Sequence, residues 1–419
     1  MTATRHGPRL AACLLAATAA LPAGAQEWTR FRGPGGSGVA TATGLPARWT
    51  AQTVTWKADL PAGGHASPVV WGNGTGAGKA RVFATAADAE GNRFILCFDA
   101  ADGRELWRRQ LALAPLRQHR DNSLAASTPA CDADGVYCLW PGAGKYLLTA
   151  FTHDGKPAWT YDLGGFSGDH GAGTSPVACG GLVIVANDQT GKSFAIAIDA
   201  RTGAKRWQFD RKSGQTTYAT ACLLQPRGAA KLLVLANGPS GFAAVDIPTG
   251  LVKWELPGVL PHRCVASPAA DGDMVVAVCG TGGRGTRLVA VKAPAAEGGK
   301  PQVALELTAD LPYVPTPLVK DGRLYTWSDR GVVTCVDLAG GKTIWQGKTG
   351  AAFYGSPVWA DGKLYCIARN GDVHVLAAGG NFEPLAVNPL GEKSFATPAV
   401  AAGRLLLRTW SKLFCVAGK

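Results

Sequence analysis

The sequence predicts an all-β protein whose fold is an eight-bladed β-propeller with four antiparallel strands in each blade. Three observations support this prediction. An eleven-residue formula recurs, as in AIDARTGAKRW from Ala197 to Trp207 and AVDIPTGLVKW from Ala244 to Trp254. Its copies begin 40 to 53 residues apart, which is the spacing of propeller blades. The 55 Gly and 26 Pro among 419 residues are typical of a turn-rich chain.

The formula places a small residue, an Asp, a Gly and a Trp at fixed offsets. The Asp side chain can accept backbone N–H bonds and tighten the turn, and the Gly tolerates a positive φ there. The Trp on the returning strand needs a partner with almost no side chain. Copies begin at Cys97, Ala150, Ala197, Ala244 and Cys335, and weaker ones at Ala290, Val375 and Cys415.

A second marker gives the same count of eight. Each unit starts an apolar run with a Ser-Pro, Thr-Pro or Ala-Thr step, at Ser67-Pro68, Thr128-Pro129, Ser175-Pro176, Ala219-Thr220, Ser267-Pro268, Thr316-Pro317, Ser356-Pro357 and Thr397-Pro398. The unit from Ser356 to Leu376 reads as three short strands separated by Asp-Gly and Asn-Gly turns, with a fourth strand after the next Gly. Four antiparallel strands make one blade.

The last unit ends at LFCVAGK, before its fourth strand. Val54 to Lys57 reads as a fourth strand that has no blade before it. We therefore expect this N-terminal strand to complete the last blade and close the ring, which removes the exposed sheet edges.

Residues 1–25 are predicted to be a cleavable signal peptide, with Arg5 and Arg9 before an apolar run and cleavage after Ala25. Residues 26–419 then form a single propeller domain that is periplasmic or secreted. No later apolar run approaches the length that spans a bilayer, so no transmembrane segment is expected. The net charge of +12 is scattered without a run of like charge, which favours a solvated surface and a monomer without nucleic-acid partners.

The formula resembles the tryptophan-docking repeat of the pyrroloquinoline-quinone (PQQ) type propellers, which quinoprotein alcohol dehydrogenases share with the outer-membrane assembly factor BamB. The opening WTRFRGPGGSG, with HGAGTSPV, is similar to exported PQQ-like repeat proteins described as BamB-like. The resemblance covers nearly the whole mature chain. It implies that each Trp docks on the small residue of its own repeat, at Trp107, Trp159, Trp207, Trp254 and Trp345, with Trp56 on Cys415. The repeats at Ala290 and Val375 lack the Trp, so we expect looser blades there.

Two other patterns are interpreted as structural. Cysteines occupy the small position of three repeats, which favours buried hydrophobic residues, with disulfides as the alternative in an exported protein. Gly33 to Gly38 spells G-x-G-x-x-G, but no strand precedes it and no helix follows it, so no phosphate site is predicted. GTGGRGTR from Gly280 to Arg287 is interpreted as a flexible hairpin.

Loops that precede the Ser-Pro markers, and loops between the second and third strands, should meet on one face of the ring. They are rich in His, Tyr and Arg, and loops on a rigid scaffold often carry function. We predict a binding site at this rim for an anionic or sugar-like ligand. Its polar contacts are predicted to be His65, His119, Arg120, His170, Asp188, His262 and Arg263.

The main functional prediction is an exported, non-catalytic propeller that binds a ligand or scaffolds envelope proteins, with no catalytic residue, metal or cofactor. The first alternative is a quinoprotein dehydrogenase with PQQ and calcium. Family enzymes of this class hold the quinone against adjacent disulfide-bonded cysteines and use an Asp base, whereas this chain has no Cys-Cys step; Asp188 or Asp329 would be the base. A remote alternative is a carbohydrate-active lyase or hydrolase that uses His170 and Tyr218.

Overall fold

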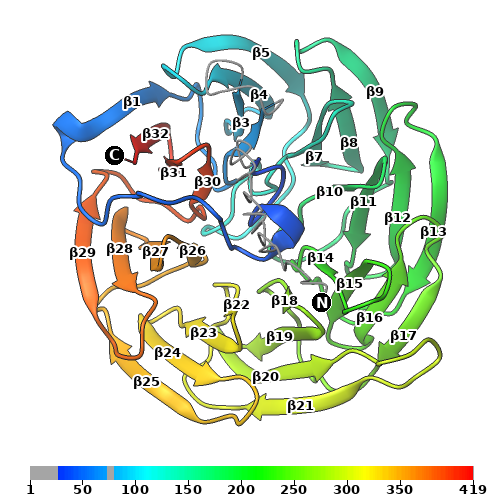
Figure 1. The fold of residues 1–419 in the computed structure, drawn as a ribbon. Helices are drawn as coiled ribbons and strands as arrows, with labels where there is room; N and C mark the ends of the chain where they lie inside the picture. Colours follow the sequence, from blue (N-terminus) through cyan, green and yellow to red (C-terminus); the bar gives the residue numbers. More distant parts are fainter. Residues whose placement is uncertain (1–26, 73–79, 419) are drawn as a thin grey trace, which may run out of the picture.

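A computed structural model describes residues 27–72 and 80–418, so the predicted signal peptide lies outside the described residues. The chain forms eight four-stranded antiparallel sheets arranged around a central axis (Figure 1). The predicted eight-bladed propeller is thereby confirmed. Among the residues described, no helix is long and apolar enough to cross a membrane.

Each blade runs from a short inner strand to an outer strand at the rim of the disc. The inner strands are β2 (Val69–Trp71), β6 (Ala130–Cys131), β10 (Val177–Cys179), β14 (Cys222–Leu224), β18 (Ala269–Asp271), β22 (Leu318–Lys320), β26 (Val358–Ala360) and β30 (Ala399–Ala401). The second strands are β3 (Arg81–Ala87), β7 (Val136–Gly142), β11 (Leu182–Asn187), β15 (Leu232–Asn237), β19 (Met274–Thr281), β23 (Arg323–Trp327), β27 (Lys363–Ile367) and β31 (Arg404–Arg408).

The third strands are β4 (Asn92–Asp99), β8 (Lys145–Phe151), β12 (Ser193–Asp199), β16 (Gly241–Asp246), β20 (Arg284–Lys292), β24 (Val332–Asp337), β28 (Asp372–Ala377) and β32 (Lys412–Ala417). The outer strands are β5 (Glu105–Ala112), β9 (Pro157–Asp162), β13 (Lys205–Arg211), β17 (Val252–Leu256), β21 (Gln302–Leu307), β25 (Thr343–Lys348), β29 (Pro384–Pro389) and β1 (Val54–Asp59). GTGGRGTR spans the β19–β20 hairpin.

The N-terminal strand closes the ring as predicted. β1 pairs antiparallel with β32, and the sheet order is β1-β32-β31-β30. The last blade therefore combines both ends of the described chain, as Figure 1 shows by the blue strand beside the red ones.

Burial explains why the repeat specifies these strands. Every residue of β11, LVIVAN, is buried, because its two faces pack on neighbouring blades. In the outer strand β9, side chains alternate between exposed and partly buried positions, which is the pattern of a strand with one solvated face. The buried clusters of apolar residues accordingly run between blades around the ring.

The recurring formula marks a β-bulge. The pairing between the third and outer strands shifts register directly beside its small residue in all eight described blades. In the turn that follows, Asp199 accepts a hydrogen bond from the N–H of Thr202 at 2.8 Å, and Gly203 has a φ of 74°. The bulge bends the outer strand and turns its Trp toward the neighbouring blade.

The docking tryptophans lie opposite the small residues named by the repeat, as the pairs Cys97–Trp107 and Ala197–Trp207 show. Five of the six docking indoles also donate a hydrogen bond to the next blade, which the sequence analysis did not anticipate. The Trp159 Nε1 donates to the carbonyl oxygen of Ala200 at 2.9 Å, and its ring covers Gly203 so closely that a Cβ there would clash. Indole-to-carbonyl bonds of this kind are made by Trp56, Trp107, Trp159, Trp207 and Trp345.

Three blade boundaries lack this indole bond among the described residues. The Nε1 of Trp254 is buried and has no described partner. Leu305 stands opposite Ala290, and Ala386 stands opposite Val375, where the other blades have a Trp. The looser packing expected for the blades that contain Ala290 and Val375 remains a prediction.

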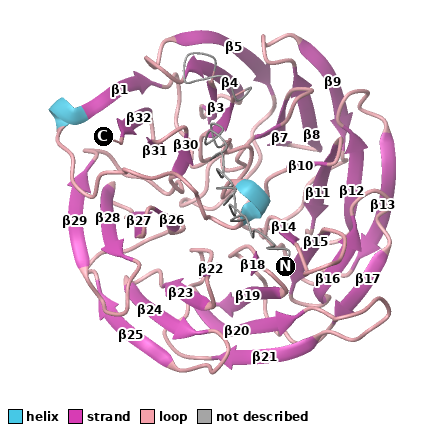
Figure 2. Cartoon of the chain, in the orientation of Figure 1, coloured by secondary structure: helices cyan, strands magenta, loops and turns pink. Residues whose placement is uncertain are grey.

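The segment from residue 27 to residue 40 crosses the centre of the ring and plugs it. Trp28 exchanges backbone hydrogen bonds with Val70 in the first blade, and Gly38 accepts one from Trp359 in the seventh. Between these contacts lies the short helix η1 (Pro34–Gly36), seen at the centre in Figure 2; the second short helix, η2 (Ala51–Thr53), leads into β1. The G-x-G-x-x-G stretch is therefore a structural turn.

Glycine is required in the plug because large side chains pack directly on its backbone. Gly33 has a φ of 66°, and a Cβ there would lie 2.4 Å from the ring of Trp28. A Cβ on Gly38 would lie 2.5 Å from the guanidinium of Arg32, which is buried and donates to the carbonyls of Pro317 and Pro357 at 2.9 Å each. All ten cysteines in the described part of the chain are unpaired, and nine are buried.

Candidate functional site

A cavity of about 710 Å³ occupies one mouth of the central channel, with Phe31 of the plug among its lining residues. Residues from the predicted loops of all eight blades line it. Of the seven predicted contacts, the structure brings together His65, His119, His170 and Arg263 in this cavity. Arg120, Asp188 and His262 do not line it.

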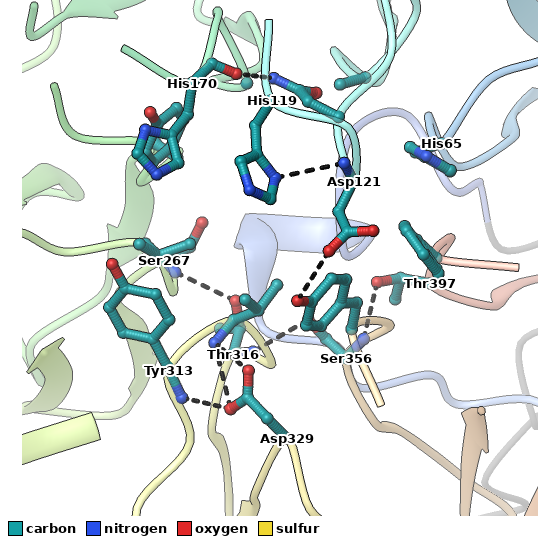
Figure 3. Close-up of a pocket in the computed structure, with 18 of the residues that line it drawn as sticks. His65, His119, Asp121, His170, Ser267, Tyr313, Thr316, Asp329, Ser356 and Thr397 are labelled. Atoms are coloured by element: carbon teal, nitrogen blue, oxygen red, sulfur yellow. Dashed lines mark hydrogen bonds between the residues drawn. The ribbon is translucent and has the colours of Figure 1, made fainter. Parts of the chain in front are cut away.

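Two histidines form a stacked pair on the cavity wall. The rings of His119 and His170 lie 5.1 Å apart at an angle of 16° (Figure 3). The Nδ1 of His119 accepts the backbone N–H of Asp121 at 3.2 Å, which orients its ring. Burial, together with the charge of Arg263, lowers the pKa of His170. The two stacked imidazoles offer a flat polar surface to a ligand.

His65 is more deeply enclosed. Its ring stacks on Phe395 at 4.4 Å and packs against Trp410 at 5.0 Å. Burial, reinforced by the positive charges of Arg408, Lys393 and Arg369, lowers the pKa of His65 to about 3. The neutral imidazole can therefore accept or donate one hydrogen bond toward the cavity but adds no charge at neutral pH.

On the wall opposite His65, Arg263 is held by Tyr313. The Arg263 Nε donates to the Tyr313 hydroxyl at 2.6 Å, and the guanidinium lies over the same ring. No carboxylate of the described residues lies within ion-pair distance of Arg263. Its positive charge is accordingly available to a ligand in the cavity.

Asp329 is one of two carboxylates that line the cavity. It accepts backbone N–H groups from Tyr313 at 2.6 Å and from Val314 at 3.2 Å. Burial raises the pKa of Asp329 to about 6, although these hydrogen bonds oppose the rise. This carboxylate fixes the loop that carries Tyr313.

The other carboxylate, Asp121, belongs to a cluster with Arg369 and Tyr354. The Arg369 guanidinium lies 3.3 Å from Asp121, and stacks over Tyr354 at 4.3 Å and Phe395 at 5.0 Å. The Tyr354 hydroxyl donates to Asp121 at 3.5 Å. Arg330 also lines the cavity and has no ion pair with the described residues, so the cavity as a whole has three arginines, Arg263, Arg330 and Arg369, against two carboxylates.

Asp188 has a structural position. Its carboxylate forms a two-pronged ion pair with Arg211, at 2.8 Å and 3.0 Å, and both side chains are 2% exposed. A direct ligand contact or a role as a base in the cavity is therefore not supported for Asp188. Arg120 is exposed, and His262 lines a separate depression of about 370 Å³ that shares Arg263 with the central cavity.

The Ser and Thr residues of the second sequence marker form a closed hydrogen-bonded ring on the cavity wall. Each backbone N–H donates to the hydroxyl oxygen of the next member at 2.9 to 3.0 Å, and the eighth bond returns to the first residue. We call this set the hydroxyl ring; its members are Ser67, Thr128, Ser175, Thr220, Ser267, Thr316, Ser356 and Thr397. Figure 3 shows the arc from Ser267 to Thr397.

Sequence analysis used these hydroxyl residues only to count blades. The signal for a shared role was present, since a hydroxyl recurs at one position in all eight units. Phe31 was also missed, because nothing in the sequence indicates that the entry segment turns back through the channel.

The residues present do not fit a calcium-dependent quinone site. Calcium prefers six to eight oxygen ligands, including free carboxylates. Both cavity carboxylates, Asp121 and Asp329, already have partners, and no cysteine lines the cavity. No group of three or more His, Cys, Asp or Glu side chains suited to a metal occurs within residues 27–72 and 80–418.

His170 and Tyr218, the pair considered for a lyase, both line the cavity. Burial raises the pKa of Tyr218 to about 12, so its hydroxyl stays protonated at neutral pH. This hydroxyl is buried and has no hydrogen-bond partner among the described residues. It is therefore a free donor for a ligand.

Comparisons with known proteins agree with the fold. The family model described as outer membrane protein assembly factor BamB matches residues 92–308 and 291–381. The solved structure of BamB from Moraxella catarrhalis has a TM-score of 0.58 at 15% identity, over 80% of this chain and 95% of that chain. Quinohemoprotein alcohol dehydrogenase ADHIIG from Pseudomonas putida HK5 has a TM-score of 0.62 at 13% identity, over 94% and 81%.

The computationally designed Ika8 protein is similar as well, with a TM-score of 0.60 at 13% identity over 87% of this chain and 99% of that chain. A comparison with curated proteins finds no match. At these identities the structural similarities establish the propeller fold alone.

Proposed function

Because the chain belongs to the family of PQQ-like repeat propellers described as outer membrane protein assembly factor BamB, we propose that it is a non-catalytic propeller that binds a ligand, or scaffolds a protein partner, in the cell envelope. The predicted signal peptide and the family support this location. The central cavity is the proposed binding site.

The observation that carries the proposal is the lining of this cavity. Arg263, Arg330 and Arg369 face two carboxylates that already have partners, so the wall has unbalanced positive charge. Aromatic rings from Tyr218, Tyr313 and other residues alternate with these cations. Charged donors combined with flat aromatic surfaces suit a compact anionic or sugar-like ligand.

The partners of the two cavity carboxylates favour binding over base catalysis at these groups. A general base must lie within hydrogen-bond reach of its substrate and be free to take up a proton. In the cavity, Asp121 is bonded to Arg369, and Asp329 is bonded to two backbone N–H groups. Asp121 is therefore paired with a cation, and Asp329 is held by the backbone of the loop that carries Tyr313.

Quinoprotein dehydrogenase activity is the second candidate, because the chain shares its fold with ADHIIG. Three arginines and a cavity of about 710 Å³ suit a planar, acidic molecule such as PQQ. The poor fit to calcium weighs against catalysis. We therefore rank cofactor-dependent activity below simple ligand binding.

The test is calorimetric titration of the mature protein with PQQ, with and without calcium, and with glucuronate and glucose, followed by dye reduction with simple alcohols. We expect saturable binding of an acidic probe without turnover. The Arg263→Ala variant should weaken this binding about tenfold, while Arg120→Ala, which removes an exposed arginine outside the cavity, should leave it unchanged. Turnover with PQQ would replace the proposal with the quinoprotein alternative.

A result without any binding would also be informative. If none of these probes binds, the cavity has no role as a site for acidic or sugar-like ligands. The other part of the proposal, that the propeller scaffolds a protein partner, would then have to be tested with envelope proteins.

A further inference from the structure

We propose that the hydroxyl ring, together with the buried Arg32 and Arg408, forms an oxyanion site at the base of the cavity, on the arc Thr316, Ser356, Thr397 and Ser67. The ligand chemistry is a phosphate, sulfate or carboxylate group. This inference deepens the proposed function, since it states the charge of the ligand and the residues that receive it.

The first argument is the supply of free donors. Each ring hydroxyl oxygen accepts one backbone N–H, and the side chains are only 2% to 5% exposed. A hydroxyl carries one donor besides its acceptor sites. No ring hydroxyl donates to any atom of residues 27–72 or 80–418. Buried donors require an acceptor, so the ring presents O–H groups that a ligand in the cavity can satisfy.

The second argument is buried positive charge beside the arc. Arg408 donates to the carbonyl of Ala66, next to Ser67, at 2.9 Å. Arg32 donates to the carbonyls of Pro317 and Pro357, next to Thr316 and Ser356, at 2.9 Å each. Both arginines are fully buried, and neither has an ion pair with a carboxylate of the described residues.

Buried cations without counter-charges are costly, and an anion nearby offsets that cost. Burial lowers the pKa of Arg32 and of Arg408 to about 9, with the charge of Glu392 partly opposing the shift at Arg408, so both remain charged at neutral pH. The Nε and Nη2 of Arg408 are also buried without a described partner. Two buried arginines without an ion pair among the described residues thus lie behind one arc of the ring.

The opposite side of the hydroxyl ring, from Thr128 to Ser267, is less favourable for an anion because fewer buried arginines lie behind it. Among the described residues, a single buried arginine without an ion pair, Arg30, bonds to the ring backbone there, at the carbonyl of Ala221 beside Thr220. Above the favoured arc, Arg369, which is paired with Asp121, and the uncharged His65 line the same cavity. We therefore place the anion between the arc and Arg369.

The experiment measures binding of inorganic sulfate and phosphate by calorimetry at constant ionic strength with chloride, and in parallel compares glucuronate with glucose. The key variant is Ser356→Ala, with Ser67→Ala as a second one if the first fails to fold. The matched control is Ser328→Ala, because this buried hydroxyl also accepts one backbone N–H, from Val332, but lies outside the ring. Thermal unfolding shows which variants are folded.

We expect one anion per chain, with affinity reduced about tenfold in Ser356→Ala and unchanged in Ser328→Ala, as for loss of a hydrogen bond to a charged group. Binding of the inorganic ions identifies a free anion. If neither inorganic ion binds, but the protein prefers glucuronate to glucose and loses this preference in Ser356→Ala, the site receives the acidic group of an organic ligand. Both outcomes support the site.

Two results would overturn it. Folded Ser356→Ala and Ser67→Ala variants that bind every probe as the wild type does would remove the ring from the site, while a loss in Arg263→Ala would still support the proposed function. Binding of no anion at all would also reject the oxyanion site. Conversely, the protein could bind sulfate in a way that depends on Ser356 and bind none of the organic probes. That result would support the oxyanion site on the hydroxyl ring and reject an acidic sugar as the ligand of the proposed function.

Discussion

The indole Nε1 of Trp107 donates a hydrogen bond to the carbonyl oxygen of His153 at 2.8 Å, and so joins the outer strand of the first blade to the second blade. The same indole covers Gly155, where a Cβ would lie 2.6 Å from the ring. The repeat thus encodes contacts between blades as well as within them.

We predict that Gly155→Ala lowers the free energy of unfolding by about 3 kcal/mol, because φ is 78° and the new methyl group would displace the indole. Gly144→Ala is the matched control in the same blade. Gly144 has a φ of 73°, but nothing lies within 4 Å of its would-be Cβ, so we expect a loss of about 1 kcal/mol. Urea denaturation measures both, and equal losses would show that the indole contact contributes nothing.

A second prediction compares two docking tryptophans. The Trp207 Nε1 donates to the carbonyl of Ile247 at 2.9 Å, whereas the Trp254 Nε1 is buried without a described partner. Because a hydrogen bond contributes about 1 kcal/mol, and an unmade buried one is costly, Trp207→Phe should destabilise the protein by about 1 to 2 kcal/mol more than Trp254→Phe. The two side chains are similarly buried, so the loss of ring area largely cancels. A larger loss for Trp254→Phe in chemical denaturation would contradict this assignment.

The third prediction concerns the pH dependence of stability. The unfolded chain protonates His65 near its ordinary pKa of 6.5, whereas the folded protein does so only near a pKa of about 3, because of burial and the nearby arginine and lysine charges. Between these values the unfolded state binds more protons. The stability contributed by a neutral His65 is therefore complete above pH 6.5 and is lost as the pH falls toward 3.

His65→Phe keeps a ring between Phe395 and Trp410 but cannot titrate. The variant should accordingly lose less stability than the wild type between pH 6.5 and pH 4, by on the order of 2 kcal/mol after allowance for partial exposure. Urea denaturation at a series of pH values gives the difference curve, in which the other titrating groups cancel. A flat difference would show that His65 takes up its proton in the folded state as well.

Local patterns explain why the fold was predictable. In the full copies of the formula, the Asp and Gly that tighten the turn lie within eleven residues of the Trp they position, so one window of sequence specifies the turn, the bulge and the returning strand. The β1–β32 closure followed from counting strands. These features depend on neighbouring residues or on strand number, both of which a sequence displays.

The candidate site was only partly predictable, because its contacts join distant residues. Arg32 bonds to Pro317 and Pro357, some three hundred residues away, so the role of the entry segment as a plug is not visible in its own sequence. The loops that carry His65, His119, His170 and Arg263 were assigned to the correct face from topology. Which way a loop side chain points was not predictable, and Asp188 turns away from the cavity.

The final prediction concerns the buried pairing of Asp188 with Arg211. The Asp188–Arg211 ion pair is almost completely buried, with both prongs within hydrogen-bond distance. Removing one member leaves an uncompensated buried charge, which typically costs 3 to 5 kcal/mol. We therefore expect Asp188→Asn to lower the free energy of unfolding by about 3 kcal/mol, and the double variant Asp188→Asn with Arg211→Met to recover much of that loss, because it removes the stranded cation.

Glu297→Gln is the control for this last prediction, since Lys253 and Glu297 form an exposed pair at 2.7 Å that water screens, so its loss should change stability far less. Chemical denaturation of the three variants separates the buried pair from the exposed one. Folded Asp188→Asn should also bind the acidic probe as tightly as the wild type, because Asp188 does not line the cavity. A loss of probe affinity without a loss of stability would return Asp188 to the binding site and show that its pairing with Arg211 opens when ligand enters.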